Sequence, residues 1–387
     1  MGRVRDSSVV ETARRSRLPS WLRGREGDAW FMLGVLLLGV ISVAGLQGIA
    51  NAMSAPAAPT AVRATQPASA SLPKGVVAAH ETVYHLPQQN PGLMTPAVDA
   101  QGRIWVGEMS ENKLAMLDPN TGKVQAWTPP NGLYNIMDVV VDGQGNVWFS
   151  EEAANYIGRF DPATQTFRTY PLGTVNGQGV GPEALALDPQ GRIWFTEVTG
   201  GALGRLDPRT GAVTTYPLPA APGGAPAYPY ALAITQDGTA WYGALSGGAV
   251  GKVDPTTGHV TAYSVGDPKA QIYSMAVGPD GAIWFTELLT NKIGRIDPRS
   301  GQVTMLTVPA TLGNPATLYD VVTRGNALWF TSTGANALVR YDPATQQFTF
   351  YQLATASSVP FGLALGPDSA LWFTADGTPN YIGVVRP

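Results

Sequence analysis

Glutamates recur at one position of a repeated tryptophan motif, and they are the side chains here most suited to chemistry. Three residues after the tryptophan, four of seven copies carry a carboxylate, namely Glu108, Glu151, Glu197 and Glu287. Carboxylate oxygens are the ligands that hard cations such as Ca²⁺ and Mg²⁺ prefer in proteins. Carboxylates that crowd together also raise one another's pKa, which prepares one of them to act as a general base. The pattern therefore predicts a site for a divalent cation or for proton transfer.

A second set of residues lies at the start of a short apolar run that precedes each tryptophan. At this position the chain has Met94, Met137, Glu183, Tyr230, Tyr273, Tyr319 and Phe361, and acidic residues follow two of them. Polar groups that converge with aromatic rings in a concavity are typical of ligand-binding sites. We expect a small molecule, a sugar or a peptide to bind at six positions: Asp138, Tyr230, Tyr273, Tyr319, Asp320 and Phe361.

The sequence lacks the residues that several other kinds of chemistry require. The chain has no cysteine, which excludes disulfides and thiolate catalysis. Its three histidines, His80, His85 and His259, fall outside both sets, and no Ser-His-Asp, phosphate-loop or Cys/His metal spacing is present. A net charge of -3 and a pI near 5.7 give no basic footprint for nucleic acid.

The elements that must position these residues follow from the tryptophans. Seven of the ten tryptophans occupy one position in a repeated segment: Trp105, Trp148, Trp194, Trp241, Trp284, Trp329 and Trp372. Their spacing is 43 to 47 residues, and a period of this length is typical of β-propeller blades. The sequence therefore predicts an all-β fold, a seven-bladed β-propeller of four-stranded blades.

Each period divides into four strands. An apolar run such as 231–234 is the first strand, the tryptophan segment is the second, an Ile-Gly-Arg-Ile-like run such as 293–296 is the third, and 213–216 is typical of the fourth. Asp-Pro and Gly-containing turns separate them. The first strands of a propeller line its central channel, so we expect both sets of site residues to meet at one mouth of that channel. Glu183 and Glu197 are the predicted catalytic pair, and Glu108, Glu151, Glu183, Glu197 and Glu287 are predicted metal ligands.

A structural interpretation of the same glutamates stays open. A carboxylate repeated in four blades can instead accept hydrogen bonds from loop backbone N–H groups, as buried polar groups generally find partners. This alternative applies to Glu108, Glu151 and Glu287. Glu183 breaks the repeat pattern and lies near Glu197 in the expected arrangement, so it is the stronger indication of a functional site.

The ring is predicted to close through the N-terminus of the propeller. After Trp372 the chain has a third strand at 382–385 and then ends. The missing fourth strand matches 81–87, whose sequence ETVYHLP resembles VTTYPLP at 213–219. Closure of this kind removes open sheet edges.

The N-terminal 79 residues divide into three predicted segments. Residues 1–28 form a basic cytoplasmic segment with seven arginines. Residues 29–50 form a transmembrane anchor or signal segment, with 18 uncharged residues at 29–46. Residues 51–79 form an Ala/Pro-rich linker before the propeller at 80–387.

The basic segment predicts that the rest of the chain lies outside the cytoplasm. A retained single-pass anchor in the cell membrane is the favoured interpretation. Secretion after cleavage near Ala50-Asn51-Ala52 is the alternative.

The repeat resembles that of the virginiamycin B lyase (streptogramin lyase) family. The best copy is Trp284-Phe285-Thr286-Glu287 followed by 291–296, and the resemblance covers residues 81–387. It implies an elimination that opens streptogramin B antibiotics at an ester linkage, with magnesium and a histidine base.

The positions that match the two family histidines are Tyr319 and Phe361, while Val359 and Asp376 match two glutamates. Asp376 thus joins the candidate metal ligands, with Mg²⁺ or Ca²⁺ as the ion. The general base is absent from its expected position.

Two functions follow from these observations. The favoured one is a membrane-tethered, monomeric ligand-binding propeller that lacks the lyase histidines. The alternative is a lyase or lactone-type hydrolase that opens a cyclic ester with a carboxylate-bound divalent cation. A purely structural or protein-interaction module is the third possibility.

Deletion of residues 81–87 tests the predicted closure of the ring. Loss of the closing strand opens a sheet edge and is expected to lower the melting temperature sharply. The measurement is a thermal unfolding curve, and an unchanged curve would argue against closure by this strand.

Overall fold

The computed structural model describes residues 61–64, 72–87, 91–130, 135–222, 224–312, 317–377 and 380–387. In these ranges the regular secondary structure consists of strands joined by turns. No helix among these residues is long and apolar enough to cross a membrane. The predicted basic segment and hydrophobic segment, 1–28 and 29–50, lie outside the described residues.

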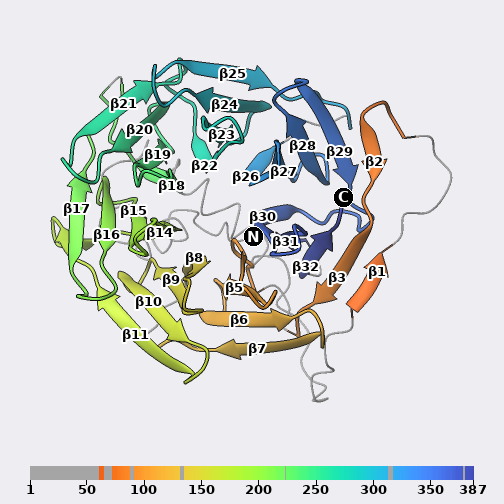
Figure 1. The fold of residues 1–387 in the computed structure, drawn as a ribbon, viewed down its shortest axis with the longest axis horizontal. Coiled ribbons are helices and arrows are strands. Elements are labelled where there is room, and N and C mark those ends of the chain that lie inside the picture. Colours follow the sequence, from red (N-terminus) through yellow and green to blue (C-terminus); the bar gives the residue numbers. More distant parts are fainter. Residues whose placement is uncertain are drawn as a thin grey trace, which may run out of the picture. The chain divides into compact units, whose positions relative to one another are not determined.

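Seven sheets arranged around a central channel form the propeller, which confirms the predicted blade number (Figure 1). From the channel outward, blade 1 is β4 (Ala97–Val98), β5 (Ile104–Glu108), β6 (Lys113–Asp118) and β7 (Lys123–Trp127). Blade 2 is β8 (Ile136–Val141), β9 (Val147–Glu151), β10 (Tyr156–Asp161) and β11 (Thr166–Pro171). Blade 3 is β14 (Pro182–Leu187), β15 (Ile193–Glu197), β16 (Ala202–Leu206) and β17 (Val213–Pro217). A short hairpin of β12 (Thr174–Val175) and β13 (Gln178–Gly179) connects blades 2 and 3.

The remaining blades repeat this order. Blade 4 is β18 (Pro229–Ile234), β19 (Ala240–Ala244), β20 (Ala249–Val253) and β21 (Val260–Ser264). Blade 5 is β22 (Ile272–Val277), β23 (Ile283–Glu287), β24 (Lys292–Ile296) and β25 (Val303–Thr307). Blade 6 is β26 (Leu318–Arg324), β27 (Ala327–Ser332), β28 (Ala337–Asp342) and β29 (Gln347–Gln352). Blade 7 is β30 (Pro360–Leu365), β31 (Leu371–Ala375), β32 (Tyr381–Val385) and β3 (Glu81–His85).

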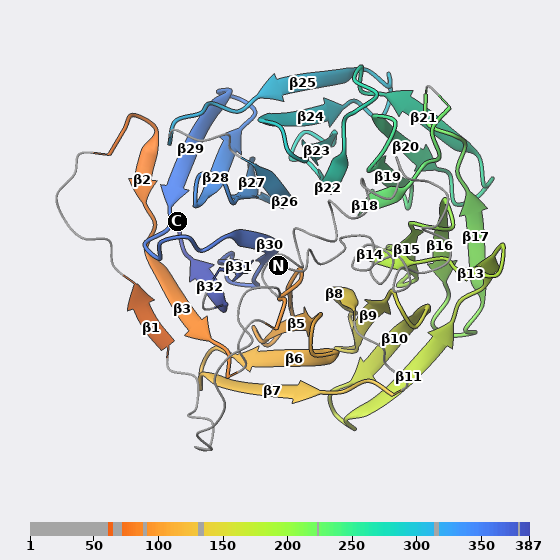
Figure 2. The ribbon, with the colours of Figure 1, turned by 180° about the vertical axis from the view of Figure 1, so that it is seen from behind.

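The closing strand is confirmed. β3 pairs antiparallel with β32, from Glu81 opposite Val385 to His85 opposite Tyr381. Both ends of the propeller therefore meet in one blade, as the view from behind also shows (Figure 2). The range predicted as a linker contributes two more strands, because extended chain can pair with the outer edge of a sheet. β1 (Ala61–Ala64) pairs with β3, and β2 (Val76–Ala78) pairs in parallel with β29 of blade 6.

The core lies between the blades. Each repeat tryptophan is at most 2% exposed and belongs to a cluster with the second strand of the following blade. Trp105 packs with Phe149, for example, and Trp148 packs with Phe195. The series ends with Trp372 of blade 7 in a cluster with Val106 of blade 1. These contacts follow one another around the ring and return to the first blade.

Glycine in the third strand leaves room for the aromatic ring of the second strand. A Cβ at Gly294 would lie 2.0 Å from Cζ of Phe285, and one at Gly204 would lie 2.1 Å from Cζ of Phe195. These distances are far below van der Waals contact, so only glycine lets the ring lie flat across the neighbouring strand. The same relation holds at Gly158, Gly251 and Gly383.

Substitution of Gly294 by alanine is expected to destabilise the fold. The added methyl group overlaps a ring that is fully buried, and overpacking of this kind costs about 1–3 kcal/mol. Gly143→Ala is the matched control, because no atom lies within 4 Å of a Cβ at that turn position. The measurement is the free energy of unfolding in urea. Equal stabilities for the two variants would contradict this account of the repeat glycine.

Candidate functional site

A β-bulge at the start of the first strand aims side chains into the channel. In blade 2 the pairing with β9 shifts between Ile136 and Val139, which leaves Met137 and Asp138 in the bulge. Similar shifts occur in blades 3 to 7. A bulge bends the strand and redirects the side chains it carries. The first-strand residues that the sequence analysis assigned to the channel mouth in blades 2 to 7 are residues of these bulges.

In blades 2, 5 and 6 a hydroxyl group of the second strand connects the bulge to the next blade. Ser150 Oγ accepts a hydrogen bond from the N–H of Asp138 at 3.1 Å and donates one to the carbonyl of Glu183 at 2.6 Å. Thr286 accepts from Ser274 and donates to Tyr319 in the same way. The hydroxyl thus sets the backbone position of a mouth residue in its own blade and of another in the following blade.

Two blades have glycine in place of this hydroxyl. A Cβ at Gly107 would lie 2.6 Å from Cγ2 of Ile136, and one at Gly243 would lie 2.3 Å from Cγ2 of Ile272. An isoleucine of the next blade occupies the space there. At these two interfaces the contact is therefore apolar.

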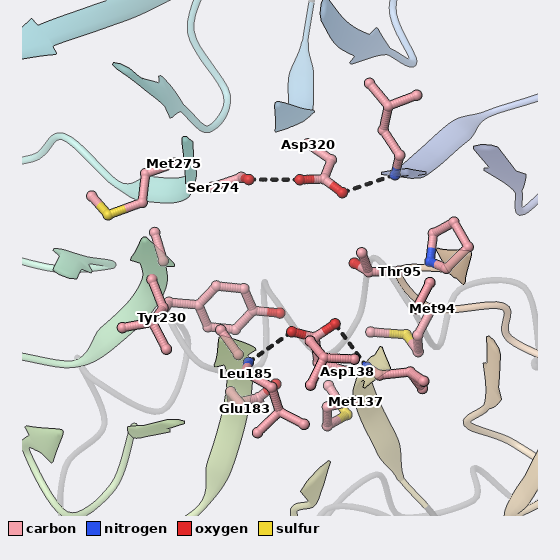
Figure 3. A pocket seen from close by; sticks show the side chains of 18 of the residues that line it. Met94, Thr95, Met137, Asp138, Glu183, Leu185, Tyr230, Ser274, Met275 and Asp320 are labelled. Atoms are coloured by element: carbon pink, nitrogen blue, oxygen red, sulfur yellow. Dashed lines mark hydrogen bonds between the residues drawn. The ribbon is translucent and has the colours of Figure 1, made fainter. Parts of the chain in front are cut away.

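Asp138 and Asp320 connect neighbouring first strands across the channel wall (Figure 3). Asp138 accepts hydrogen bonds from its neighbour Val139 and from the N–H of Leu185 in the next blade at 2.7 Å. Burial raises the pKa of Asp138 to about 7, the two hydrogen bonds lower it, and the charge of Asp320 raises it. This predicted ligand-binding residue therefore also has a structural role.

Asp320 makes the equivalent connection between blades 6 and 7. Its carboxylate accepts from the N–H of Leu363 at 2.8 Å and from the hydroxyl of Ser274 at 2.6 Å. Burial raises its pKa, and these hydrogen bonds lower it. Ser274 was missed by the sequence analysis, although it occupies the bulge position equivalent to Asp138.

The predicted aromatic residues form one continuous group, here called the aromatic arc: Tyr230, Tyr273, Tyr319 and Phe361. Ring centroids are 4.9 Å apart for Tyr230 and Tyr273, 5.2 Å for Tyr273 and Tyr319, and 5.1 Å for Tyr319 and Phe361. The ring of Tyr319 stands at 86° to that of Tyr273. The structure brings together all four rings that the sequence placed at the mouth.

Carboxylates lie beside this arc. Glu183 is 7% exposed, and burial, with the charges of Glu152 and Asp138, raises its pKa well above the usual range. Glu152 is a residue that the sequence analysis missed. It accepts a hydrogen bond from Asn135 at 3.2 Å, and burial raises its pKa. The pair of adjacent glutamates at 151–152, unique among the second-strand ends of the repeat, was the available signal.

A cavity of about 310 Å³ occupies the channel beneath the mouth. Asp138, Glu183, Tyr230, Tyr273 and Asp320 line it together with methionine and aliphatic side chains (Figure 3). Of the predicted catalytic pair, the cavity contains Glu183 but not Glu197. The first-strand residues therefore line the channel, whereas the second-strand glutamates, which were expected to meet them at the same mouth, do not line this cavity.

The second-strand glutamates lie between blades instead of in the channel. Side chains alternate along a strand, so Glu151 shares a face with Phe149, whose ring packs against Trp105 of the preceding blade. Glu108 and Glu151 are fully buried, and their carboxylate oxygens have no hydrogen-bond partner among the described residues. Burial raises their pKa values to about 7 and about 8.

The other two second-strand glutamates have partners. Glu197 accepts a hydrogen bond from the hydroxyl of Thr215 at 3.2 Å, and Lys292 Nζ lies 3.9 Å from a carboxylate oxygen of Glu287. Burial raises the pKa of both glutamates, and these partners lower it. Backbone N–H partners, which the structural interpretation expected for Glu287, do not appear for it among the described residues.

The magnesium implied by the resemblance does not fit the residues present. Asp376 accepts a hydrogen bond from Asn380 at 2.6 Å, and burial raises its pKa to about 6. Among the described residues, no group of three or more His, Cys, Asp or Glu side chains is arranged to hold a metal ion. Val359, at the other glutamate position, is 39% exposed and has a positive φ of 52°, which is unusual for a β-branched residue. We therefore assign no chemical step to a metal.

The fold and the channel define the class: a closed seven-bladed propeller with its polar groups at the bulges of the first strands. Within that class, a sequence model of the Virginiamycin B lyase family matches residues 174–386. The chain belongs to this family.

Solved structures of lyases are similar over nearly their whole length. The virginiamycin B lyase of Staphylococcus aureus is 27% identical with a TM-score of 0.70, over 79% of this chain and 99% of that one. A catalytically inactive variant of that enzyme with quinupristin is 26% identical, with the same TM-score and coverage. Hydrazine synthase of Kuenenia stuttgartiensis, 14% identical with a TM-score of 0.62 over 78% and 97% of the chains, shares the fold alone. No curated protein matches the chain.

The buried Glu151 predicts a pH dependence of stability. Its pKa is about 8 in the folded chain against 4.5 for an unperturbed glutamate, so the native state holds the proton more tightly. The free energy of unfolding therefore falls as pH rises from about 4.5 to about 8 and is level above that range. Glu151→Gln removes this component, so the variant is expected to be more stable than the parent at pH 8 and equal to it near pH 4.5.

Urea unfolding at several pH values measures this effect. Glu111→Gln, at an exposed loop position, changes the net charge equally and serves as control. A Glu151→Gln variant that follows the parent at every pH would show that the carboxyl is ionised in the folded chain.

Proposed function

We propose that this chain is a ligand-binding propeller that uses the channel mouth of a lyase-like fold without the lyase base. The observation that carries the proposal is the pair Tyr319 and Phe361, which occupy the positions matched to the family histidines. Their ring centroids are 5.1 Å apart, and both pack on Tyr273. An imidazole can accept a proton near neutral pH, whereas a phenyl ring cannot.

The remaining hydroxyl does not replace the missing base. Burial raises the pKa of Tyr319, and the charge of Asp376 raises it further. A neutral phenol with a raised pKa is a poor proton acceptor, and it keeps the site apolar and aromatic. These properties favour binding of a ligand over abstraction of a proton from it.

One observation favours the alternative enzyme. Glu183 is a buried carboxyl with a raised pKa that lines a cavity, which is typical of general bases. In that case the chain would be a lyase or lactone-type hydrolase that opens a cyclic ester such as a streptogramin. The divalent cation expected for this alternative from the sequence finds no fitting group of ligands among the described residues. Quinupristin in the related Staphylococcus structure is the reason to include this substrate class in a test.

The proposal also includes the cellular location of the chain, which is a membrane anchor with the propeller outside the cytoplasm. The apolar run 29–46 after an arginine-rich segment supports a retained anchor with the propeller outside the cytoplasm. In intact cells that express a chain tagged after Pro387, added protease is expected to remove the tag while a cytoplasmic control protein survives. A protected tag would contradict the proposed orientation.

Turnover and metal binding separate the two functions. We expect the full-length chain to leave streptogramin B antibiotics and simple lactones unchanged in the presence of Mg²⁺ or Ca²⁺. We also expect neither ion to raise its melting temperature. The measurements are chromatography of the substrates and thermal unfolding, with Glu183→Gln and Glu197→Gln as comparisons. Ring opening that is lost in Glu183→Gln would establish the enzyme instead, and a metal-dependent shift lost in either variant would contradict the expected absence of a metal site.

A further inference from the structure

The cavity beneath the mouth has carboxylates and aromatic rings but no cationic or amide lining. Among the described residues its lining contains Asp138, Glu183 and Asp320, two tyrosines, and no Lys, Arg, His, Asn or Gln. An anionic ligand would find no opposite charge there. A sugar, whose hydroxyls need several donors as well as acceptors, would find side-chain hydroxyl donors only at Thr95 and the two tyrosines of the described lining, because Ser274 already donates to Asp320. The lining fits a ligand that brings positive charge.

One of the three carboxylates, that of Glu183, has no hydrogen-bond partner among the residues that the structure describes. Asp138 and Asp320 each accept hydrogen bonds from two backbone N–H groups. Glu183 is 7% exposed, lines the cavity, and accepts no side-chain hydrogen bond from a described residue. A buried carboxylate without a partner is costly, and a cation in the cavity would supply what the protein does not.

The aromatic arc supplies a second, independent interaction. Tyr230 and Tyr273 line the cavity, and Tyr319 and Phe361 pack behind Tyr273. The rings of Tyr230 and Tyr273 are inclined at 35° and those of Tyr273 and Tyr319 at 86°, so the arc presents tilted rings instead of one flat stacking platform. The negative faces of such rings attract ammonium groups, and desolvation increases this attraction.

The volume and the apolar part of the lining also limit the size of the ligand and the polarity of its substituents. About 310 Å³ is at the small end of ligand sites. Val140, Leu232 and Met275 also line it. Apolar side chains at these positions favour alkyl or aryl substituents over additional polar groups.

From these observations, and resting on the ligand-binding function proposed above, we infer that the channel binds a compact organic ammonium ion. The ammonium group lies against Glu183 and the face of Tyr230, next to Asp138. Its alkyl or aryl substituents face Val140, Leu232 and Met275. The ligand class is therefore a small quaternary or hindered amine.

Calorimetric titration of the full-length chain with tetramethylammonium, choline and benzyltrimethylammonium tests this inference. We expect at least one of these probes to bind. The uncharged isostere of choline, 3,3-dimethylbutan-1-ol, is expected to bind at least about tenfold more weakly, because it has the same shape without the charge.

Three substitutions assign the binding to the channel. Glu183→Gln and Tyr230→Leu are each expected to weaken binding by about tenfold, whereas Tyr230→Phe keeps the ring and is expected to stay within about twofold of the parent. Glu111→Gln is the charge-matched control and is expected to leave the affinity unchanged. Thermal unfolding curves establish that each variant is folded before its titration is compared.

The outcomes separate this inference from the proposed function. Absence of binding by all three ammonium probes, equal binding of the isostere, or equal losses in Glu111→Gln and Glu183→Gln would overturn the inference. If glucose or another neutral ligand instead binds in a manner that depends on Tyr230, the ligand-binding function stands and the cationic ligand class falls. Ester ring opening dependent on Glu183 would contradict the proposed function itself.

Discussion

Each repeat tryptophan packs against the second strand of the following blade, and the whole propeller depends on this contact. A single blade is a four-stranded sheet with two apolar faces, which cannot be buried within the blade. The indole lies on one face of its own blade, and an aromatic ring from the second strand of the following blade packs against that indole. Closure from Trp372 to Val106, with β3 completing the last sheet, leaves no blade with an uncovered face.

The same interfaces carry the polar contacts that shape the channel. Hydroxyls such as Ser150 and Thr286 hold bulges of two successive blades, and Asp138 and Asp320 connect neighbouring first strands. The mouth residues are thus fixed by the packing that builds the ring. A framework of this kind allows mouth side chains to be exchanged while the ring that positions them stays intact.

Buried carboxyls mark two different situations in this propeller. Asp138 and Asp320 have several backbone donors, which offset part of the cost of their burial. Glu108 and Glu151 lie between blades without a partner among the described residues, and burial raises their pKa values toward neutrality. A neutral carboxyl there is consistent with a structural position. Glu183, which has no hydrogen-bond partner among the described residues, lines the cavity, which is consistent with a ligand site.

The sequence by itself determined the number of blades, the closing strand and most of the first-strand residues that stand in the bulges. Those features follow from local periodicity, because the tryptophan spacing and the ETVYHLP match are visible without any knowledge of distant contacts. Only the tertiary structure decided which residues share a space. Alternation along the second strand turns Glu151 and Glu197 toward a neighbouring blade, while a bulge turns Glu183 and Tyr230 into the channel. Bulges and inter-blade hydrogen bonds depend on pairing between strands, and a repeat pattern read along one chain does not contain that information.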